Sequence, residues 1–454
     1  MTSSRDIAVR HSFARDACGL ELVPESVARP KTETDVVALL REASADRVPV
    51  TPAGGQTSTT GASITDRGIL LSLRGLTDIG DVDRERLTVR AQAGVNLGDL
   101  KRRLAADGLL FAPDPTSEDD ATLGGAIACN ASGARSLLYG ATRPHIAALR
   151  VALADGSVHE LRRTRLEKNT VGYAAVHDPI DWFIGSEGTL GVILEAELSL
   201  LPLPPNVTGL AIPFPEEHVA LDFIIAARSS TDVSPRCLEY FDGRALEVAR
   251  TAEGAADWAS GAGALVYVEQ AAAAGSEIPL DAWLMLAQNC AAAENDILVY
   301  EGTAALRDAR RLRHTVPSTM IERGNRYRGA GGRRVSTDWA VPYRRLKDAI
   351  AASRRYAADA GIDQPVVYGH AGNGHPHQNF IARDADELAR MEQVVERTLK
   401  YVIGVGGTVA AEHGIGKIKR KWLPLQLTPL QLGMMAAMKH TLDPKLLLAP
   451  GNLF

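Results

Sequence analysis

The sequence has few cysteines and no long apolar run, and both absences exclude classes of protein. Its four cysteines lie far apart without a C-x-x-C pair, so neither a disulfide framework nor a zinc-finger pattern is indicated. No stretch approaches the roughly 18 apolar residues of a membrane helix. The N-terminal stretch MTSSRDIAVRHSFARDACG carries charges throughout and lacks the apolar core of a secretory signal. We therefore expect a cytoplasmic protein with reduced thiols and no transmembrane segment.

An excess of charge of one sign is also missing. The 454 residues include 50 Lys and Arg against 55 Asp and Glu, which leaves a net charge of -5. This balance argues against a nucleic-acid or anionic-membrane binder and favours small molecules or proteins as partners. The fractions of hydrophobic (45%) and charged (23%) residues are ordinary for a soluble globular protein. At about 150 residues per domain, the length predicts two or three domains.

Helical and strand patterns alternate along the chain. Two stretches have apolar residues at helical spacing: one follows Thr32 as a candidate N-cap, and the other runs from Asn96 as cap to Gly108 as stop. A third helical stretch spans 218–230. Strand-like stretches are 48–52, 68–73, 87–95, 208–214, 237–242 and 264–270. The prolines of 201–206 end a strand, and the region beyond them predicts an antiparallel sheet backed by helices.

The loop PAGGQTSTTGAS, residues 52–63, places three glycines among hydroxyl residues directly after a strand. Glycine lets a ligand approach the backbone, and consecutive NH groups can converge on an anion such as a pyrophosphate. A flexible surface turn explains the same composition equally well. Neither G-x-G-x-x-G nor G-x-x-x-x-G-K-[ST] occurs in the chain. A dinucleotide at this loop would therefore not be bound on a Rossmann fold.

Two further stretches, 113–146 and 182–204, are also rich in glycine and small residues. A chain so depleted of large side chains either moves or wraps closely around a flat ligand. In their order and spacing, the three loops resemble the FAD-binding domain of the vanillyl-alcohol oxidase or PCMH superfamily of flavoproteins. The resemblance covers most of residues 25–205 and implies that FAD is a cofactor.

The resemblance also implies individual contacts with FAD. Backbone NH groups of the first loop would hold the pyrophosphate, and the other loops would line the remainder. Some members attach FAD to a histidine where this chain has Gln56, so we expect non-covalent FAD. The implied FAD-binding residues are Pro52, Gly54, Gly55, Gln56, Thr57, Ser58, Thr59, Pro115, Thr116, Gly124, Gly125, Ala128, Ser132, Gly133, Tyr139, Gly188, Val192 and Asn452.

The stretch GHAGNGHPHQNF places His370, His375 and His377 within eight positions of a chain that has only eleven histidines. The glycines between them predict a tight turn that joins two strand ends. On a strand, His375 and His377 would share a face with Asn379. Two imidazoles and one carboxylate, such as Glu412, form a common site for zinc, manganese or iron. The alternative is a solvated histidine-rich turn with Glu412 in a salt bridge.

Together with AAEHGIGKIKRKWL and DPKLLLAPGNLF, this stretch resembles the FAD-linked oxidase C-terminal domain of the D-lactate, D-2-hydroxyglutarate and glycolate dehydrogenases. The resemblance implies that His370, His377 and Glu412 bind a divalent metal, zinc or manganese. It also implies that His413 is the catalytic base. His375 stands where relatives usually have asparagine, so its role stays open.

The implied reaction is the FAD-dependent oxidation of a D-2-hydroxy acid to the 2-oxo acid. The metal polarises the substrate hydroxyl, His413 removes its proton, and hydride passes to flavin N5. The substrate carboxylate would bind an arginine, Arg313 first and Arg310 second, unless these belong to a solvated basic helix. Asn379 is a further candidate catalytic residue. Ser336 stands where 2-hydroxyglutarate enzymes have a lysine, which argues against a dicarboxylate substrate.

The implied fold class is α+β. We expect a two-lobed PCMH-type FAD-binding domain over residues 1–205. A cap domain over 206–420, with an antiparallel sheet backed by helices, would carry the metal and the catalytic histidine. A C-terminal helical segment, 421–454, would return to the FAD domain.

Two other functions compete with this one. HGIGKIKRKWL and DPKLLLAPGNLF also resemble alkylglycerone-phosphate synthase, an FAD-dependent transferase, although its run of histidines is replaced here by Ala411 and Glu412. A flavin- or metal-binding protein without catalysis would have no need of His413 beside Glu412. For the dehydrogenase, the electron acceptor stays open among a quinone, a cytochrome, an electron-transfer flavoprotein and oxygen, as does a homodimer.

Overall fold

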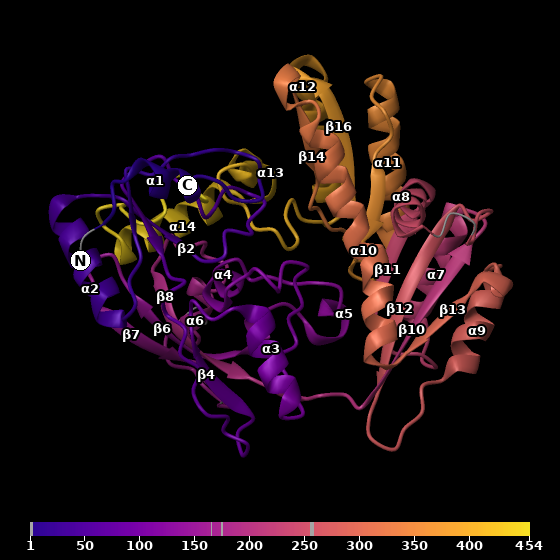
Figure 1. The fold of residues 1–454 in the computed structure, drawn as a ribbon, viewed down its shortest axis with the longest axis horizontal. Helices are drawn as coiled ribbons and strands as arrows, with labels where there is room; N and C mark the ends of the chain where they lie inside the picture. Colours follow the sequence, from indigo (N-terminus) through magenta and orange to yellow (C-terminus); the bar gives the residue numbers. More distant parts are fainter. Residues whose placement is uncertain (1–2, 165, 174–175, 255–257) are drawn as a thin grey trace. The chain divides into compact units, whose positions relative to one another are not determined.

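The computed structural model describes residues 3–164, 166–173, 176–254 and 258–454, and the chain divides into two compact units (Figure 1). The first unit contains the chain up to Gly133, then Gly140–Leu203 and Glu412–Phe454; the second contains Ala134–Tyr139 and Pro204–Ala411. Both units combine helices with sheets, which confirms the predicted α+β fold class. Within the described ranges, none of the helices has both the length and the apolar character that crossing a bilayer requires.

Two short segments belong to a different unit from the one that the sequence predicts. Residues 134–139 group with the second unit, and residues 412–420 group with the first. The physical reasons are local: helix α5 (Ser136–Tyr139) packs against a strand of the second unit, while the backbone of Ile415 and Gly416 is hydrogen-bonded to Glu187 of the first. The division after Leu203 lies two residues before the predicted one.

The first unit holds two main sheets that differ in strand direction. The smaller sheet is parallel, in the order β1-β3-β2, and the larger is antiparallel, in the order β4-β8-β6-β7. A short pair, β5 and β9, is separate from both. The strands are β1 (Ser26–Ala28), β2 (Val50–Ala53), β3 (Ile69–Ser72), β4 (Thr88–Gln92), β5 (Leu109–Leu110), β6 (Ile146–Ala152), β7 (Val158–Arg162), β8 (Val192–Ser199) and β9 (Leu201–Pro202).

Two helices of the first unit begin at the caps that the sequence predicts. Thr32 caps α2 in a capping box with Asp35, and the Asn96 side chain caps α3 by accepting the Asp99 NH. Gly108, the predicted stop, follows the end of α3 with a φ of 72°. The helices are α1 (Ile7–Ser12), α2 (Glu33–Asp46), α3 (Leu97–Ala106), α4 (Leu123–Ala128), α6 (Ile180–Phe183), α13 (Leu423–Gln426) and α14 (Pro429–Leu442).

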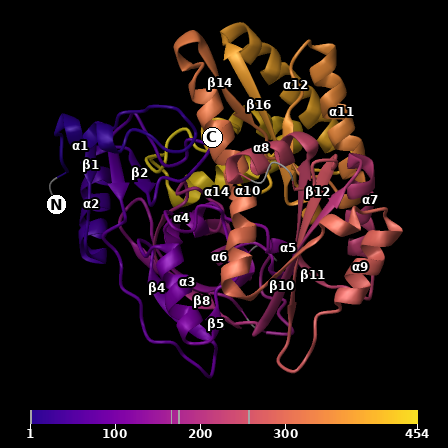
Figure 2. The same cartoon turned by 45° about the vertical axis from the view of Figure 1, so that its right-hand side comes forward.

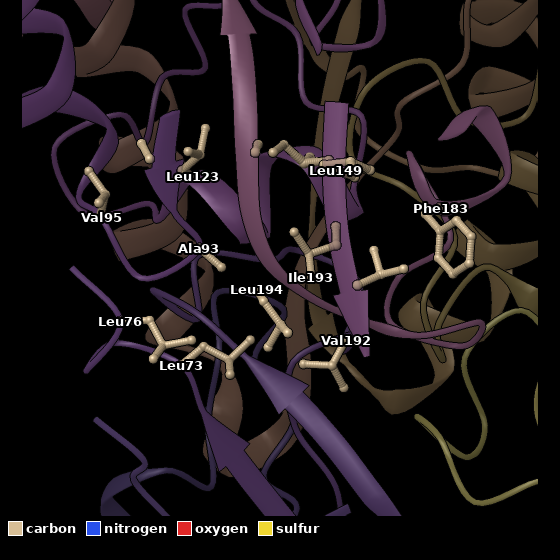
Figure 3. Close-up of a cluster of buried hydrophobic side chains, with 14 of the residues drawn as sticks. Leu73, Leu76, Ala93, Val95, Leu123, Leu149, Phe183, Val192, Ile193 and Leu194 are labelled. Carbon is tan, nitrogen blue, oxygen red and sulfur yellow. The ribbon is translucent and has the colours of Figure 1, made fainter. Parts of the chain in front are cut away.

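The core of the first unit lies between the larger sheet and the helices α3 and α4. Figure 3 shows Ile193 and Leu194 of β8 together with Ala93 and Leu123 in this cluster of buried side chains. Val192, at the start of β8, is fully buried in the same cluster. This packed layer forms a rigid frame from which the glycine-rich loops extend.

Within its described residues, the second unit is built on a seven-stranded antiparallel sheet in the order β13-β10-β12-β11-β15-β16-β14. This confirms the predicted antiparallel sheet backed by helices. The strands are β10 (Asn206–Phe214), β11 (Pro235–Asp242), β12 (Ala264–Ala272), β13 (Leu298–Glu301), β14 (Gly331–Ser336), β15 (Val366–Gly369) and β16 (His377–Asp384). The remaining helices are α7 (Glu217–Ser229), α8 (Gly243–Glu253), α9 (Leu280–Asn289), α10 (Gly302–Asn325), α11 (Leu346–Asp359) and α12 (Ala385–Gly404).

Helices cover both faces of this sheet. On one face, Ala211 of β10 packs with Val316 and Met320 of the long helix α10, which runs along the sheet in both views (Figure 1 and Figure 2). Because strand side chains alternate between faces, Phe214 points to the opposite side. There it contacts Phe223 of α7, with ring centroids 5.1 Å apart. Both faces of the sheet are therefore covered by helices.

Candidate active site

A cavity in the first unit is lined by all three glycine-rich loops. Its walls consist largely of glycine, alanine, serine and threonine, which leave the backbone open to a ligand. Glu412 and His413 also line it. The predicted FAD-binding residues on its walls are Pro52, Gly54, Gly55, Gln56, Thr57, Ser58, Thr59, Pro115, Thr116, Gly124, Gly125, Ala128, Ser132 and Gly188. This small-residue composition suits a flat, elongated cofactor such as FAD.

The glycines of the first loop are required by close packing between loops. A Cβ on Gly54 would lie 2.0 Å from Thr122 Oγ1, and one on Gly55 would lie 2.1 Å from the carbonyl oxygen of Asp120. From outside, Arg74 donates hydrogen bonds to the carbonyl oxygens of Gly54 and Gly55, at 3.1 and 2.8 Å. The loop is therefore held in one conformation, which contradicts the interpretation as a flexible surface turn.

Gln56 has a structural role in this loop. Its backbone φ is 56°, and its side-chain amide donates hydrogen bonds to the carbonyl oxygens of Phe13 and Ser63, at 3.0 and 3.2 Å. The amide is not a nucleophile and is engaged in bracing the loop. Both facts fit non-covalent FAD at this position.

The segment that carries Glu412 and His413 is fixed to the cavity by Glu187. This buried carboxylate accepts hydrogen bonds from the NH groups of Ile415 and Gly416, at 2.6 and 2.7 Å. Burial raises the pKa of Glu187, and these hydrogen bonds lower it in part. Ser132 Oγ also donates to Glu412 Oε2 at 3.2 Å. The candidate base and its neighbouring carboxylate are thus integral to the cavity wall.

Four predicted FAD-binding residues do not line this cavity. Val192 belongs to the hydrophobic core, and a Cβ on Gly133 would lie 2.1 Å from the Asp114 carbonyl oxygen. Tyr139 groups with the second unit. The Asn452 amide donates to the carbonyl oxygens of Ala62 and Glu187, at 2.8 and 3.2 Å, and so braces the wall from behind.

The cavity also has residues that the sequence prediction missed. Thr122 caps α4 and accepts the Gly125 NH, which the T-L-G-G pattern could have indicated as an N-cap. Glu187 lies within the third glycine-rich stretch, but its partners lie 228 and 229 residues away, so no local pattern reveals them. Cys129 lines the cavity, and burial raises its pKa to about 12, which keeps the thiol neutral.

In the second unit, the three clustered histidines lie at the closed end of a hairpin formed by β15 and β16. Tyr368 pairs with His377 in the antiparallel register, which confirms the predicted turn between two strand ends. Gly369 has a φ of 122°, and a Cβ there would lie 2.8 Å from the His377 ring. The turn itself needs Gly374, whose Cβ would lie 1.9 Å from the Val341 carbonyl oxygen.

The three imidazoles converge in a buried cluster. The rings of His375 and His377 are 4.6 Å apart between centroids, and each lies 5.4 Å from the His370 ring. One ring nitrogen of each histidine lies within 4.8 Å of those of the others, a spacing that could hold a metal ion. All three side chains are buried, which argues against a solvated turn.

Two of these histidines lie beside buried carboxylates, and one of them, His370, is hydrogen-bonded to its carboxylate. Glu239 Oε1 lies 2.6 Å from His370 Nδ1, and Asp338 Oδ1 lies 3.0 Å from His375 Nε2. Burial opposes ionisation of Glu239, but His370 and Arg313 outweigh it and lower its pKa to about 2. A carboxylate on one ring nitrogen is common for metal-binding histidines. In this structure the other nitrogen of His370, Nε2, faces the Arg313 guanidinium.

The two predicted substrate arginines both face buried carboxylates. Arg313 Nε lies 2.6 Å from Glu239 Oε2, and its Nη2 lies 2.9 Å from His370 Nε2. Arg310 lies 3.8 Å from Glu269, which Arg135 and Arg236 also contact. The alternative of a solvated basic helix is contradicted for Arg313, because its side chain is only 12% exposed.

Asn379 lies on β16, two residues beyond His377 and on the same face. It is buried, its Oδ1 accepts a hydrogen bond from Arg334 at 3.0 Å, and its Nδ2 donates to the Tyr368 hydroxyl at 3.3 Å. His375 precedes the strand, so the prediction that it shares this strand face is wrong. Arg334 was not among the predicted site residues.

Two family models match the chain. A model of the FAD binding domain matches residues 24–162, and the model of the C-terminal domain of FAD linked oxidases matches residues 203–453. Together they include both glycine-loop regions before residue 162, the histidine hairpin and the Glu412–His413 pair. The matched residues account for most of the chain.

Curated relatives are similar over nearly the whole sequence. The glycolate oxidase subunit GlcD of Bacillus subtilis is 31% identical, with 95% of this chain and 89% of the relative covered. A D-lactate dehydrogenase of Archaeoglobus fulgidus is 32% identical, covering 94% and 90%. A D-2-hydroxyglutarate dehydrogenase of Xanthomonas citri is also 32% identical, covering 95% and 89%.

Solved structures of alkyldihydroxyacetonephosphate synthase share the fold. Two of them superpose with a TM-score of 0.71, and the aligned region covers 99% of this chain and 83% of theirs. Their sequences are only 19% and 18% identical to this one. At that identity, the similarity supports the fold and carries no argument about the reaction.

The packing of the first loop predicts the effect of a single added methyl group. We expect Gly55→Ala to lower the FAD content of the purified protein by at least about tenfold, because the new Cβ must displace the loop from Asp120. FAD content would be measured from the ratio of flavin to protein absorbance. Gly433→Ala, at an open position of α14, is the control and should keep its flavin. Full flavin content in Gly55→Ala would contradict this role of the loop.

Proposed function

The chain belongs to the FAD-linked oxidases, and from this membership we propose that it oxidises a D-2-hydroxy acid to the 2-oxo acid. One observation carries the proposal beyond family membership. Glu412 and His413 line the same cavity as the glycine-rich loops, so a candidate base and a candidate metal ligand belong to the cofactor cavity itself. A protein that only stored flavin would gain nothing from a base in that wall.

The cavity residues suit the parts of FAD. The NH groups of the first loop are available for the pyrophosphate, and the small side chains of the other loops admit a flat ring system close to the backbone. Non-covalent binding follows from Gln56, whose amide braces the loop. FAD, when bound, supplies the hydride acceptor for oxidation at C2 of the substrate.

His413 is the proposed base. Its side chain is partly exposed at the cavity wall and lies 3.5 Å from Glu412. An imidazole in this position can accept the proton of a substrate hydroxyl as the C–H bond at C2 breaks. The hydrogen bonds from Ile415 and Gly416 to Glu187 keep its segment in place.

The proposed metal ligands are His370, His377 and Glu412. The two histidines lie in the buried cluster, and the assignment of Glu412 rests on the sequence resemblance. A divalent cation, zinc or manganese, would polarise the substrate hydroxyl when bound. His370 suits this role because Glu239 holds its Nδ1 and so fixes the orientation of the ring.

We include His375 in the same metal site. Asp338 Oδ1 lies 3.0 Å from its Nε2, an ion-pair distance without a hydrogen bond, and the His375 ring lies close to that of His377. A histidine that only completed a turn would not need a fully buried carboxylate as its partner. His375 would therefore add an imidazole at a position where relatives usually have asparagine.

The transferase alternative has less support. Its structural similarity concerns the fold, and the replacement of its histidine run by Ala411 and Glu412 supplies a carboxylate where the dehydrogenase needs one. The electron acceptor, whether quinone, cytochrome, electron-transfer flavoprotein or oxygen, and a homodimeric state stay predictions from the sequence.

Replacing the base tests the reaction directly. We expect His413→Gln to slow the anaerobic reduction of the flavin by substrate by about 10²–10⁴-fold, because the hydroxyl proton loses its acceptor. Stopped-flow absorbance, with rates expressed per bound flavin, would measure the effect. His440→Gln, at an exposed position of α14, is the matched control. A His413→Gln protein that reduces its flavin at the unchanged rate would rule out His413 as the base.

The metal proposal predicts changes in metal content. Purified protein should contain about one divalent ion, and His377→Ala should lose it because a ligand is missing. We expect His375→Asn to weaken metal affinity, and Asp338→Asn to weaken it by about 10–100-fold. Elemental analysis after dialysis against a metal buffer would measure all of these. His159→Ala, at an exposed site, should retain the metal, and equal retention by His375→Asn would assign His375 to the turn alone.

A further inference from the structure

Four arginines of the second unit lie beside buried carboxylates. Arg313 pairs with Glu239, while Arg135, Arg236 and Arg310 surround Glu269. Each of these guanidinium groups thus has a carboxylate within 4.0 Å, although three of them share the single carboxylate of Glu269. That Arg313 or Arg310 meets the substrate stays a prediction.

Arg334 differs from these residues. Its side chain is partly buried, and among the described residues its hydrogen bond goes to the neutral amide oxygen of Asn379, with no carboxylate within 4.0 Å. Burial lowers the pKa of Arg334, which is the direction expected for a desolvated guanidinium without an acid beside it. A buried charge without a counter-charge is costly unless a ligand provides one.

The strand register places Arg334 on the same face as the histidine cluster. Ser336 pairs with Asn379, and Arg334 pairs with Ile381, so these residues share the face of His377. The Arg334 guanidinium reaches back to Asn379, which lies two residues, or about 7 Å, along β16 from His377. Arg334 therefore lies on the same face of the sheet as His377, farther along the strand pair from the hairpin turn.

We propose that Arg334 is a specificity-determining residue that binds a second carboxylate on the side chain of the 2-hydroxy acid. The inference rests on the proposed function, because it assumes that the hydroxyl end of the substrate lies at the histidine cluster. Because Asn379 lies two residues along the strand from His377, the second carboxylate would lie beyond C2 on the side chain of the substrate. The 2-hydroxyglutarate enzymes have a lysine at the position of Ser336. Arg334, two residues earlier and on the same strand face, would take the place of that lysine.

A pair of matched substrates tests this assignment. D-2-hydroxyglutarate and D-2-hydroxyvalerate differ by a carboxylate in place of a methyl group. We expect the native protein to favour the diacid, and Arg334→Met to lower the ratio of the two kcat/KM values on the order of 100-fold. Arg334→Lys should restore part of the ratio because it keeps the charge.

Arg333→Met is the matched control. Arg333 is the neighbouring residue on β14, points to the other face and pairs with Glu392 at 3.3 Å. Its replacement should leave the ratio of the two kcat/KM values within about threefold of the native one. An unchanged ratio in Arg334→Met, or a native protein without preference for the diacid, would overturn the proposal.

Thermal unfolding separates this role from a structural one and from the reaction itself. Arg334→Met should unfold at the native temperature or above it, because the change removes an unpaired buried charge. Glutarate, which has no hydroxyl to oxidise, should raise the unfolding temperature of the native protein and not that of Arg334→Met. If no hydroxy acid reduces the flavin, the proposed function fails, whereas equal stabilisation of both proteins by glutarate overturns the Arg334 assignment.

Discussion

The candidate active site depends on the pair of hydrogen bonds that Glu187 accepts from Ile415 and Gly416. They join a loop near the middle of the first unit to a segment more than two hundred residues later, and they fix Glu412 and His413 in the cavity wall. The carboxylate is buried, so these NH groups replace the water that it lacks. Without them, the proposed base would no longer be held at the wall of this cavity.

In the second unit, buried carboxylates lie beside histidine and arginine side chains. Glu239 is hydrogen-bonded to His370 and forms an ion pair with Arg313. Asp338 lies beside His375. Glu269 lies within 4.0 Å of three other arginines. Such pairs contribute little net stability, since desolvation offsets much of their attraction. Their effect is to fix the positions of imidazole and guanidinium groups. Arg334 differs from these arginines because its hydrogen bond goes to the neutral amide of Asn379.

Local patterns allowed much of this structure to be predicted. The caps at Thr32 and Asn96, the glycine-rich loops and the histidine hairpin all depend on residues close in sequence. The pairing of Arg313 with Glu239 could not be predicted in this way, because strand order decides which distant residues meet. Val192 shows the same limit: the family resemblance implied a cofactor contact, whereas the sheet buries it in the core.

The most direct test of the account is an anaerobic titration of the flavin-loaded protein with D- and L-2-hydroxy acids, before and after chelation of divalent metal. We predict that D-acids bleach the flavin absorbance band, that L-acids leave it, and that chelation slows the bleaching strongly. Flavin that stays oxidised with every D-2-hydroxy acid, in protein that retains both flavin and metal, would contradict the proposed oxidation.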